Sequence, residues 1–387
     1  MKKIRDILIS IILSLVFGFF SFNFYQSYID EKEEKSIEED LPSTQEKSDF
    51  QNLLNDNTYY YYNQLDDSDK RIYLTLYSSF MRFDDAVTTP AEESSLKDIF
   101  KAVLYDNPHI FWVEHDFEYV INENSIKFIP HYRYNVTESK AIKSQIDNKI
   151  NHIIDIADNY ATEYEKELYI HDYICENTVY DETIDGNTIY DALITGKAVC
   201  EGYAKTVQIL LDRLDIDNYL VVGDSEFEGE LGPHMWNIVT IDNQNYHLDA
   251  TWNDNDKEND INYFYFNISD DEIKEDHFNI SPTDNFCISD NANYFVQNES
   301  YIENFNSFND HISRSAEILY RGENKVEFLF DDTDGFNKAV KYIENDNGFF
   351  KYIFESIKRS CKKIDTSEIT YITIIEHNYL CVVFKEG

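Results

Sequence analysis

A cysteine stands at the beginning of a predicted helix in the stretch GKAVCEGYAKTVQILLDRL, residues 196–214. From Cys200 onward, apolar residues recur at offsets of 3, 4, 7, 10, 11 and 14 positions, the period of one helix face. A thiol in a first helical turn lies beside unpaired N–H groups and the positive end of the helix dipole, which favour a thiolate and suit an oxyanion. Free cysteine is also among the most buried residue types, so Cys200 is either a packed core thiol or a nucleophile. Gly202, two residues later, would let another backbone approach closely.

A nucleophilic cysteine needs a base and an acid, and the stretch GPHMWNIVTIDNQNYHLDATW, residues 232–252, contains candidates for both. Asp242-Asn243 is a plausible two-residue hairpin turn, because both residues tolerate positive φ. This turn pairs Ile241 with Gln244 and puts His234 and Asp249 on one face, with Cβ atoms roughly 7–8 Å apart. The opposite face is apolar and consists of Met235, Val239, Ile241, Leu248 and Ala250. We expect this apolar face to be the core side, so the His234–Asp249 pair should face away from that core.

Each of these polar residues also has a structural interpretation. His234 could be a hydrogen-bonded structural histidine, and Asp249 could tie down the strand end. His247 shares the face of His234 and is a rival base, but its place in mid-strand beside Leu248 favours packing. A shifted turn would reverse the facing of the whole hairpin.

The composition narrows the function classes. The 33 basic and 74 acidic residues give a net charge of -41, which disfavours nucleic acid and anionic lipid as partners. Hydrophobic residues make up 42%, enough for a packed core. The chain has no CxxC, HExxH, P-loop or GxGxxG motif, so we expect no metal centre and no cofactor. The acidic stretch 253–262 lacks the glycine and final glutamate of a calcium loop and is interpreted as a solvated loop.

The N-terminus has the pattern of a membrane segment. Lys2, Lys3 and Arg5 precede an apolar run over residues 7–25, which as a helix spans roughly 28 Å. The basic flank predicts a single-pass signal anchor in the cell membrane with the bulk of the chain extracytoplasmic. A removed signal peptide is the alternative, although no small-x-small cleavage site follows.

The remaining chain is interpreted as alternating helices and strands. Helices are expected at 66–80, with Ser68 or Asp69 as the N-cap, and at 95–106, 137–159 and 162–178. A hairpin is expected over 117–134. A separate C-terminal pattern predicts a strand at 325–331, helices at 333–344 and 348–361, and two final strands that turn at His377-Asn378 and end at Phe384. The predicted segments are a membrane helix at 1–27, an acidic linker at 28–50, an N-terminal α/β region at 51–135, a core at 136–290 and a C-terminal α/β region at 291–387.

The blocks GKAVCEGYAKT, PHMWNIV and YHLDATWND together resemble the transglutaminase-like superfamily, papain-type cysteine enzymes with a circularly rearranged core. The order Cys, His, Asp and the separations of 34 and 15 residues fit its bacterial members. IHDYICENTVYD at 170–181 and KAVLYDNPHIFWV at 101–113 are similar to further regions of multidomain bacterial forms. The resemblance implies an α+β fold whose core, at 136–290, packs a cysteine-bearing helix on an antiparallel sheet.

The resemblance also implies a catalytic triad. Cys200 would attack an amide or acyl carbonyl, His234 would take its proton and return it to the leaving group, and Asp249 would orient His234. The N–H of Cys200 would form part of the oxyanion hole, with Tyr180 or Tyr190 as a second donor, although packing is the preferred role for either tyrosine. Trp236 and Trp252 would wall the site or serve as core aromatics.

The mechanism leaves the reaction outcome open. If water attacks a thioester on Cys200, the protein is a peptidase, amidase or deamidase. If an amine attacks it, the protein is a crosslinking acyltransferase. We expect hydrolysis of a protein or peptide, including cell-surface material, because water needs no dedicated second-substrate site. A noncatalytic scaffold is the alternative from another class.

The other cysteines have structural interpretations. Cys175 is expected to be packed, and Cys361 and Cys381 form either a disulfide or two separate core thiols.

Overall fold

The computed structural model describes residues 59–90, 93–227, 229–255, 260–282, 286–308, 311, 325–345, 364–375 and 377–386. The predicted membrane segment, the acidic linker, the helix predicted at 348–361 and Cys361 lie outside these residues. In the part of the chain that the structure describes, no helix is long and apolar enough to cross a bilayer. The chain divides into two compact units, and each is discontinuous in sequence: one reaches Asn159 and adds Asp181–Leu220, and the other joins Tyr160–Tyr180 to the residues from Val221 onward.

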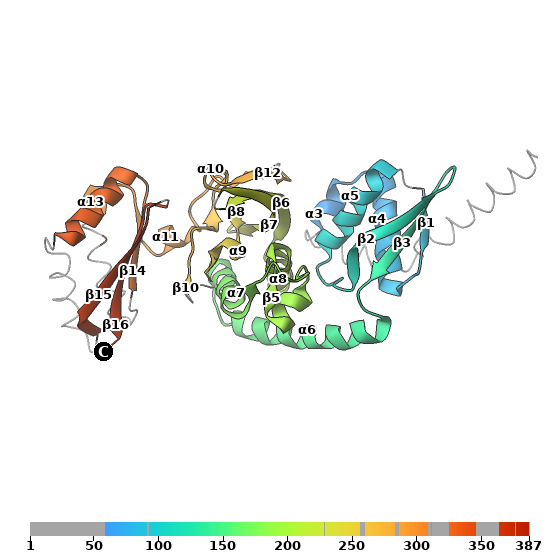
Figure 1. Ribbon diagram of the computed structural model, residues 1–387, viewed down its shortest axis with the longest axis horizontal. Coiled ribbons are helices and arrows are strands. Elements are labelled where there is room, and N and C mark those ends of the chain that lie inside the picture. Colours follow the sequence, from blue (N-terminus) through green and yellow to red (C-terminus); the bar gives the residue numbers. More distant parts are fainter. Residues whose placement is uncertain are drawn as a thin grey trace, which may run out of the picture. The chain divides into compact units, whose positions relative to one another are not determined.

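The first unit combines helices with a small antiparallel sheet of order β1-β3-β2 (Figure 1). The β2–β3 hairpin pairs Ile121 with Ile126 and closes through the Asn122 N–H to the Ser125 carbonyl at 2.9 Å, which confirms the predicted hairpin. The unit contains α3 (Tyr60–Gln64), α4 (Asp67–Arg82), β1 (Val87–Thr89), α5 (Glu93–Asp106), β2 (Val113–Ile121), β3 (Ile126–Tyr132), α6 (Val136–Ala157), the π-helix η1 (Asp191–Thr195), β5 (Lys197–Ala198) and α8 (Cys200–Asp212).

The second unit is built on a five-stranded sheet of order β11-β8-β7-β6-β12 and a four-stranded sheet of order β13-β14-β16-β15. Strand β6 (Asn218–Phe227) begins in the first unit and continues into the second. The five-stranded sheet is completed by β7 (Glu230–Ile241), β8 (Gln244–Leu248), β11 (Phe266–Ile268) and β12 (His277–Ser281). The helices and short strands are α7 (Glu163–Asn177), β4 (Val179–Tyr180), α9 (Ala250–Asn253), β9 (Asp254–Asn255), β10 (Asp260–Ile261), α10 (Asp270–Ile273) and α11 (Tyr294–Gln297).

The C-terminal pattern is confirmed where the structure describes it. A buried apolar cluster joins α13 (Thr333–Glu344) to the four-stranded sheet, whose strands are β13 (Tyr301–Ile302), β14 (Lys325–Phe330), β15 (Ile364–Ile374) and β16 (Tyr379–Glu386). Asn378 has φ 49°, as expected in a tight turn between β15 and β16. The chain is therefore a mixed α+β protein.

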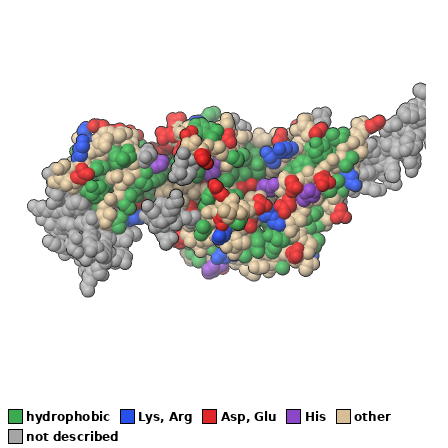
Figure 2. Space-filling view, viewed as in Figure 1, with side chains coloured by type: hydrophobic (Ala, Val, Ile, Leu, Met, Phe, Trp, Pro, Cys, Tyr) green, Lys and Arg blue, Asp and Glu red, His purple; other side chains and the backbone are tan. Residues whose placement is uncertain are grey.

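Acidic side chains begin many of the helices. The side chain of Asp66 accepts the N–H groups of Ser68 and Asp69 at the start of α4, so the cap lies two residues before the earlier of the two predicted positions. Helices α6, α7 and α10 begin with reciprocal capping boxes that end in Glu138, Glu165 and Glu272. Acidic groups are also spread over the surface seen in Figure 2, as the net charge requires.

Candidate active site

Cys200 is the first residue of α8, as the sequence predicts, and its side chain is partly exposed. The residue before it, Val199, has extended backbone and carries no polar side chain that could cap the helix. The carbonyl of Val199 accepts the N–H groups of Gly202 and Tyr203, at 2.9 and 3.2 Å. The thiol therefore lies at the positive end of the dipole of a 13-residue helix, beside the unpaired N–H groups of its first turn.

The first turn of α8 is held by a backbone contact that only glycine permits. A Cβ atom at Gly202 would lie 2.5 Å from the Gly186 carbonyl oxygen and 2.8 Å from the Ala198 Cβ. The same Gly186 carbonyl accepts the Val199 N–H at 2.9 Å. The expectation that Gly202 admits another backbone is confirmed, and the segment around Gly186 fixes the position of the cysteine.

Replacing Gly202 by alanine should therefore destabilise the protein by roughly 1–3 kcal/mol, the usual range for overpacking, because backbone atoms must move. Denaturant unfolding followed by circular dichroism measures this. Gly232→Ala is the matched control, since a Cβ there meets nothing within 4 Å. Equal stability of the two variants would contradict the packing argument.

Polar residues line the side of α8 opposite the apolar stripe, and they too are buried. Lys205 is only 4% exposed and forms an ion pair with Glu201 at 2.7 Å. His115 Nε2 approaches the same carboxylate at 3.2 Å from the more exposed side. The Gln208 side chain donates to the Tyr105 carbonyl at 3.0 Å. Protein therefore surrounds the helix, and the sequence pattern alone does not indicate this.

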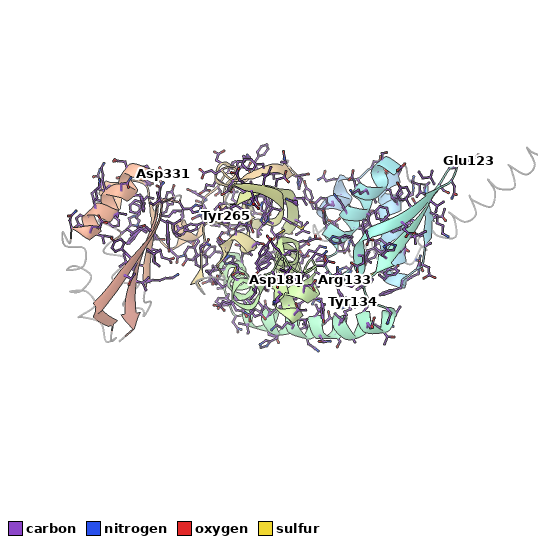
Figure 3. The ribbon with its side chains drawn as sticks, viewed as in Figure 1. Glu123, Arg133, Tyr134, Asp181, Tyr265 and Asp331 are labelled. Atoms are coloured by element: carbon purple, nitrogen blue, oxygen red, sulfur yellow. The ribbon has the colours of Figure 1, made fainter. Side chains whose placement is uncertain are left out.

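Arg133 connects the end of the β-hairpin to the segment that contacts α8. Its guanidinium reaches Asp185 at 2.6 Å, Glu114 at 3.0 Å and Asp191 at 3.6 Å, and it donates to Asn187 at 3.2 Å. Figure 3 labels this arginine among the side chains of the first unit. Burial alone would lower the pKa of Arg133, but its acidic partners raise it. The sequence does not reveal this group, because its members are spread from Glu114 to Asp191, which lie 77 positions apart.

The hairpin that carries the candidate base has the predicted register. Ile241 pairs with Gln244, and Asp242 and Asn243 have φ values of 50° and 61°, as a two-residue turn with positive φ requires. His234 and Asp249 accordingly lie on one face and make a hydrogen bond of 2.6 Å between Nε2 and Oδ2.

This polar pair does not face away from a core, which corrects the expectation. His234 is 6% and Asp249 1% exposed. The Trp236 ring stacks on His234 with a centroid distance of 5.9 Å, and the Trp252 ring lies at the same distance. Both sides of the hairpin are covered, so hydrophobic alternation could not identify a single core side.

Asp249 has a second task as the N-cap of α9. Its Oδ1 accepts the N–H groups of Thr251 and Trp252 at 3.0 and 3.2 Å, which leaves Oδ2 for His234. Burial opposes the charge, but His234 and then His277 outweigh it and hold the pKa of Asp249 well below its usual range. The carboxylate is thus ionised and fixed in orientation. Because Nε2 of His234 is used for Asp249, proton exchange with a thiol would occur through Nδ1.

His247 occupies a structural position, as preferred. Its Nδ1 accepts the Trp236 indole N–H at 3.0 Å, and its Nε2 lies 3.0 Å from an Asp270 carboxylate oxygen. Burial lowers the pKa of His247. His247, Asp270 and Cys287 have donor atoms within 4.8 Å of one another, as a metal site would. However, the indole bond uses the lone pair of Nδ1, so Nε2 carries the proton and is not a metal ligand in this arrangement.

A second histidine, His277, also contacts Asp249, and no sequence motif predicts it. Its Nε2 lies 3.2 Å from Asp249 Oδ2, and its Nδ1 lies 2.6 Å from Asp276 Oδ1. His277 lies 28 positions beyond Asp249, on a strand at the sheet edge. The only sequence signal is a histidine that directly follows an acidic pair, Glu275-Asp276.

Cys175 and Tyr190 make packing contacts. Cys175 is buried and its thiol donates to the Ala250 carbonyl at 3.4 Å. The Tyr190 ring lies 5.9 Å from that of Tyr134 and 6.4 Å from that of Phe111. Tyr180 is 37% exposed, and neither tyrosine is assigned here as an oxyanion donor.

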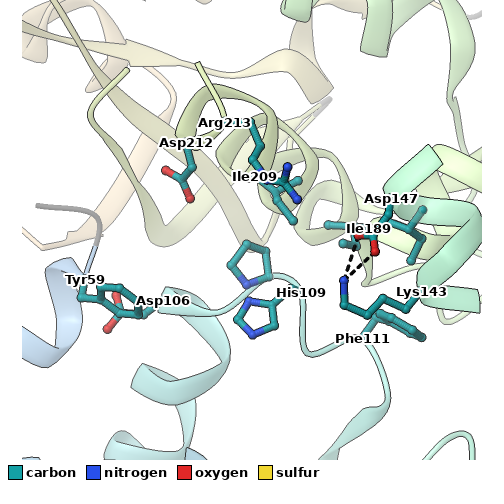
Figure 4. Close-up of a pocket in the computed structure, with 12 residues that line it drawn as sticks. Tyr59, Asp106, His109, Phe111, Lys143, Asp147, Ile189, Ile209, Asp212 and Arg213 are labelled. Carbon is teal, nitrogen blue, oxygen red and sulfur yellow. Dashed lines mark hydrogen bonds and ion pairs between the residues drawn. The ribbon is translucent and has the colours of Figure 1, made fainter. Parts of the chain in front are cut away.

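A cavity of about 340 Å³ lies at the opposite end of α8 from the thiol (Figure 4). Its lining includes Asp106, His109, Asp212 and Arg213. Burial raises the pKa of Asp106 to about 7, and burial followed by the charge of Asp106 raises that of Asp212. Twelve residues at 1.5 Å each put Asp212 about 18 Å along the helix from Cys200, so this cavity is not the cleft of the nucleophile.

Cys200 belongs to the first unit, and His234 and Asp249 belong to the second. The structure brings His234 and Asp249 together within their unit. The catalytic assignment of all three residues stays a prediction.

Comparison with known proteins identifies the domain. Residues 153–250 match the family model described as the transglutaminase-like superfamily. Among solved structures, a TGase is 18% identical, with 43% of this chain and 50% of that chain covered and a TM-score of 0.25. A candidate cysteine protease from Cytophaga hutchinsonii is 13% identical, with 35% and 61% covered and a TM-score of 0.24. A candidate protease from Parabacteroides distasonis is 13% identical, with 36% of each chain covered and a TM-score of 0.22.

The chain thus spans between about a third and three fifths of the length of these solved structures. A comparison with curated proteins gave no match. The family match covers the Cys200, His234 and Asp249 positions. The chain therefore contains a transglutaminase-like domain over residues 153–250.

Proposed function

We propose that the protein is a membrane-anchored, extracytoplasmic cysteine enzyme that hydrolyses peptide or amide bonds, with Cys200 as nucleophile, His234 as base and Asp249 as orienting acid. The observation that carries the proposal is the buried His234–Asp249 hydrogen bond of 2.6 Å in a transglutaminase-like domain. The bond holds the proton of the neutral imidazole on Nε2. Nδ1 is then the nitrogen that accepts a proton from the thiol.

The reaction follows from these groups. His234 Nδ1 takes the proton of Cys200, and the thiolate sulfur attacks the carbonyl carbon. The N–H groups in the first turn of α8 stabilise the oxyanion. When the C–N bond breaks, His234 gives its proton to the leaving amine and a thioester remains. His234 then takes a proton from water, the hydroxyl attacks the thioester, and the acid product leaves as the proton returns to the sulfur.

The location is proposed from the N-terminal sequence. The basic residues before the apolar run at 7–25 favour retention of that flank in the cytoplasm. Substrates would then be proteins or peptides outside the membrane, including cell-surface material.

The test uses the full-length protein in detergent with peptide and glutamine-donor substrates, with and without an added primary amine. We expect release of the acid product and of ammonia or the leaving amine, and loss of this activity in Cys200→Ser. Cysteine-dependent incorporation of the added amine would instead identify an acyltransferase. No turnover of any substrate would favour a scaffold.

Iodoacetamide labelling supplies a readout that needs no substrate. Cys200 should be modified preferentially near neutral pH, because it is partly exposed at a helix N-terminus, whereas Cys175 and Cys287 are buried with raised pKa values. Mass spectrometry of tryptic peptides locates the label. Slow labelling of Cys200 that is unchanged in His234→Ala would contradict an activated thiol.

A further inference from the structure

His277 lies between two carboxylates, with one at each ring nitrogen. Nδ1 is 2.6 Å from Asp276 Oδ1, and Nε2 is 3.2 Å from Asp249 Oδ2. The His277 side chain is fully buried, as is that of Asp249. A carboxylate oxygen only accepts hydrogen bonds, so each of these contacts requires a proton on the facing nitrogen.

Hydrogen-bond donors surround both carboxylates. Asp276 Oδ2 accepts the Tyr265 hydroxyl at 2.5 Å. Asp249 accepts two backbone N–H groups on Oδ1 and the His234 ring on Oδ2. Since donors already occupy these oxygens, a proton shared between His277 and either aspartate resides on the imidazole.

We propose that His277 is a doubly protonated imidazolium at neutral pH and acts as a positioning residue that fixes Asp249 and limits how strongly Asp249 raises the basicity of His234. This inference rests on the proposed function of the His234–Asp249 pair. The protonation state of His277 does not depend on activity, so it can be tested separately.

The limit on basicity follows from charge. The ring centroids of His277 and His234 are 5.3 Å apart. Two positive charges at that separation, at an effective dielectric constant of about 20, disfavour one another by roughly two pKa units. A permanent cation at His277 therefore offsets part of the attraction that the buried Asp249 exerts on a proton at His234.

Titratable and aromatic groups from neighbouring elements surround His277. Burial alone would lower the pKa of His277, but the hydrogen bonds to Asp249 and then Asp276 raise it, while His234 lowers it. Strand β8 contributes His247, whose own pKa the charge of His277 lowers. The aromatic walls are the rings of Trp236, Trp252 and Tyr265, at centroid distances of 4.9, 4.6 and 5.7 Å.

A metal ion is the alternative occupant of this group. The donor atoms of His234, Asp249 and His277 lie within 4.8 Å of one another, which two histidines and a carboxylate could use to bind zinc. Zinc binding requires bare Nε2 atoms, whereas the bonds of both rings to the single Asp249 Oδ2 require Nε2–H on both. The metal-free and zinc-bound states thus differ in whether Nε2 of His277 carries a proton, which NMR observes directly.

The first experiment is ¹⁵N NMR of the full-length protein, with the His277 ring assigned by comparison with His277→Gln. We expect two ring N–H signals for His277 at every pH from 5 to 8. A bare Nε2 or Nδ1 at pH 7 would overturn the proposal. A bare Nε2 that gains its proton after EDTA treatment would overturn it as well and would identify a metal site.

The second experiment measures the titration of His234 in the Cys200→Ser background. His277→Gln retains an amide donor for Asp249 and removes the charge, so the pKa of His234 should rise by about one to two units. In the active protein, the acid limb of kcat/KM, which reports protonation of the base His234, should move to higher pH by a similar amount. Asp276→Asn should leave His277 with one ring proton at pH 8.

Asp270→Asn is the matched control, because Asp270 forms the other carboxylate–histidine pair of this sheet, with His247. It should leave the pKa of His234 unchanged. A merely structural His277 would change stability without moving that pKa, which would overturn the proposal. Failure of the proposed hydrolysis would remove the kinetic readout only, and both NMR results would still decide the protonation state.

Discussion

Replacing Asp249 by asparagine is expected to lower kcat/KM by about 10³–10⁴-fold while the protein stays folded. Asparagine keeps the oxygen that accepts the N–H groups of Thr251 and Trp252, and it is a good N-cap. Its NH₂ group, however, replaces the Oδ2 atom that accepts from His234 at 2.6 Å. Two donors then face each other, and His234 is driven to carry its proton on Nδ1, the wrong nitrogen for accepting one from Cys200.

Steady-state kinetics on the peptide substrate, with unfolding measured in parallel, test this expectation. Asp270→Asn alters the second carboxylate–histidine pair, which is assigned no catalytic part, and should change kcat/KM only a few-fold. Near-normal activity of Asp249→Asn would show that the pair is structural. A loss of activity that follows a loss of folded protein would be uninformative about the tautomer, so ¹⁵N spectra of His234 supply the decisive signal.

Replacing Glu167 by glutamine is expected to stabilise the protein by about 2–3 kcal/mol at pH 7. Glu167, on α7, is fully buried, and its Oε2 accepts the Asn267 amide at 2.7 Å. Burial raises the pKa of Glu167 from 4.5 to about 8. Within the described residues, Glu167 Oε1 and Asn267 Oδ1 are both buried acceptors without a donor, and a protonated acid would supply one. Glutamine supplies the same donor without a proton to lose.

The sign follows from linkage. Because the folded state holds this proton up to a pH near 8, whereas the unfolded chain releases it near 4.5, stability falls as the pH rises between these values. Urea unfolding from pH 4.5 to 8 should show this decline in the unsubstituted protein and a weaker one in Glu167→Gln. Glu176→Gln, an exposed position on the same helix, is the control and should differ little from the parent. A destabilised Glu167→Gln would mean that the buried carboxyl is ionised and paired.

Local chemistry in the sequence predicted much of the site. The helix that starts at Cys200 followed from its apolar period, and the β7–β8 register followed from one turn whose residues accept positive φ. That register is sufficient to bring His234 against Asp249. The burial of the pair was not predictable in this way, because both faces of the hairpin are covered and the covering residues come from distant segments.

Groups that form only through tertiary contacts could not be predicted from the sequence. His277 reaches Asp249 from another strand, and Arg133 gathers acids from three separate segments. No periodicity links these residues. The cap of α4 was misplaced for a related reason: Asp66, Ser68 and Asp69 are all good cap residues, and only the backbone geometry selects Asp66.

The acidic caps at the helix N-termini determine how this strongly anionic chain responds to salt and to low pH. With 33 cations for 74 anions, side-chain cations cannot neutralise most carboxylates, and backbone amides at the starts of helices do part of that work. Hydrogen bonds from Ser68 and Thr162 and from neighbouring amides lower the pKa of Asp66 and of Glu165. Dissolved ions screen such short, directed contacts poorly, whereas protonation abolishes them. Salt should therefore leave the first turns of these helices intact, whereas acidification should destabilise them.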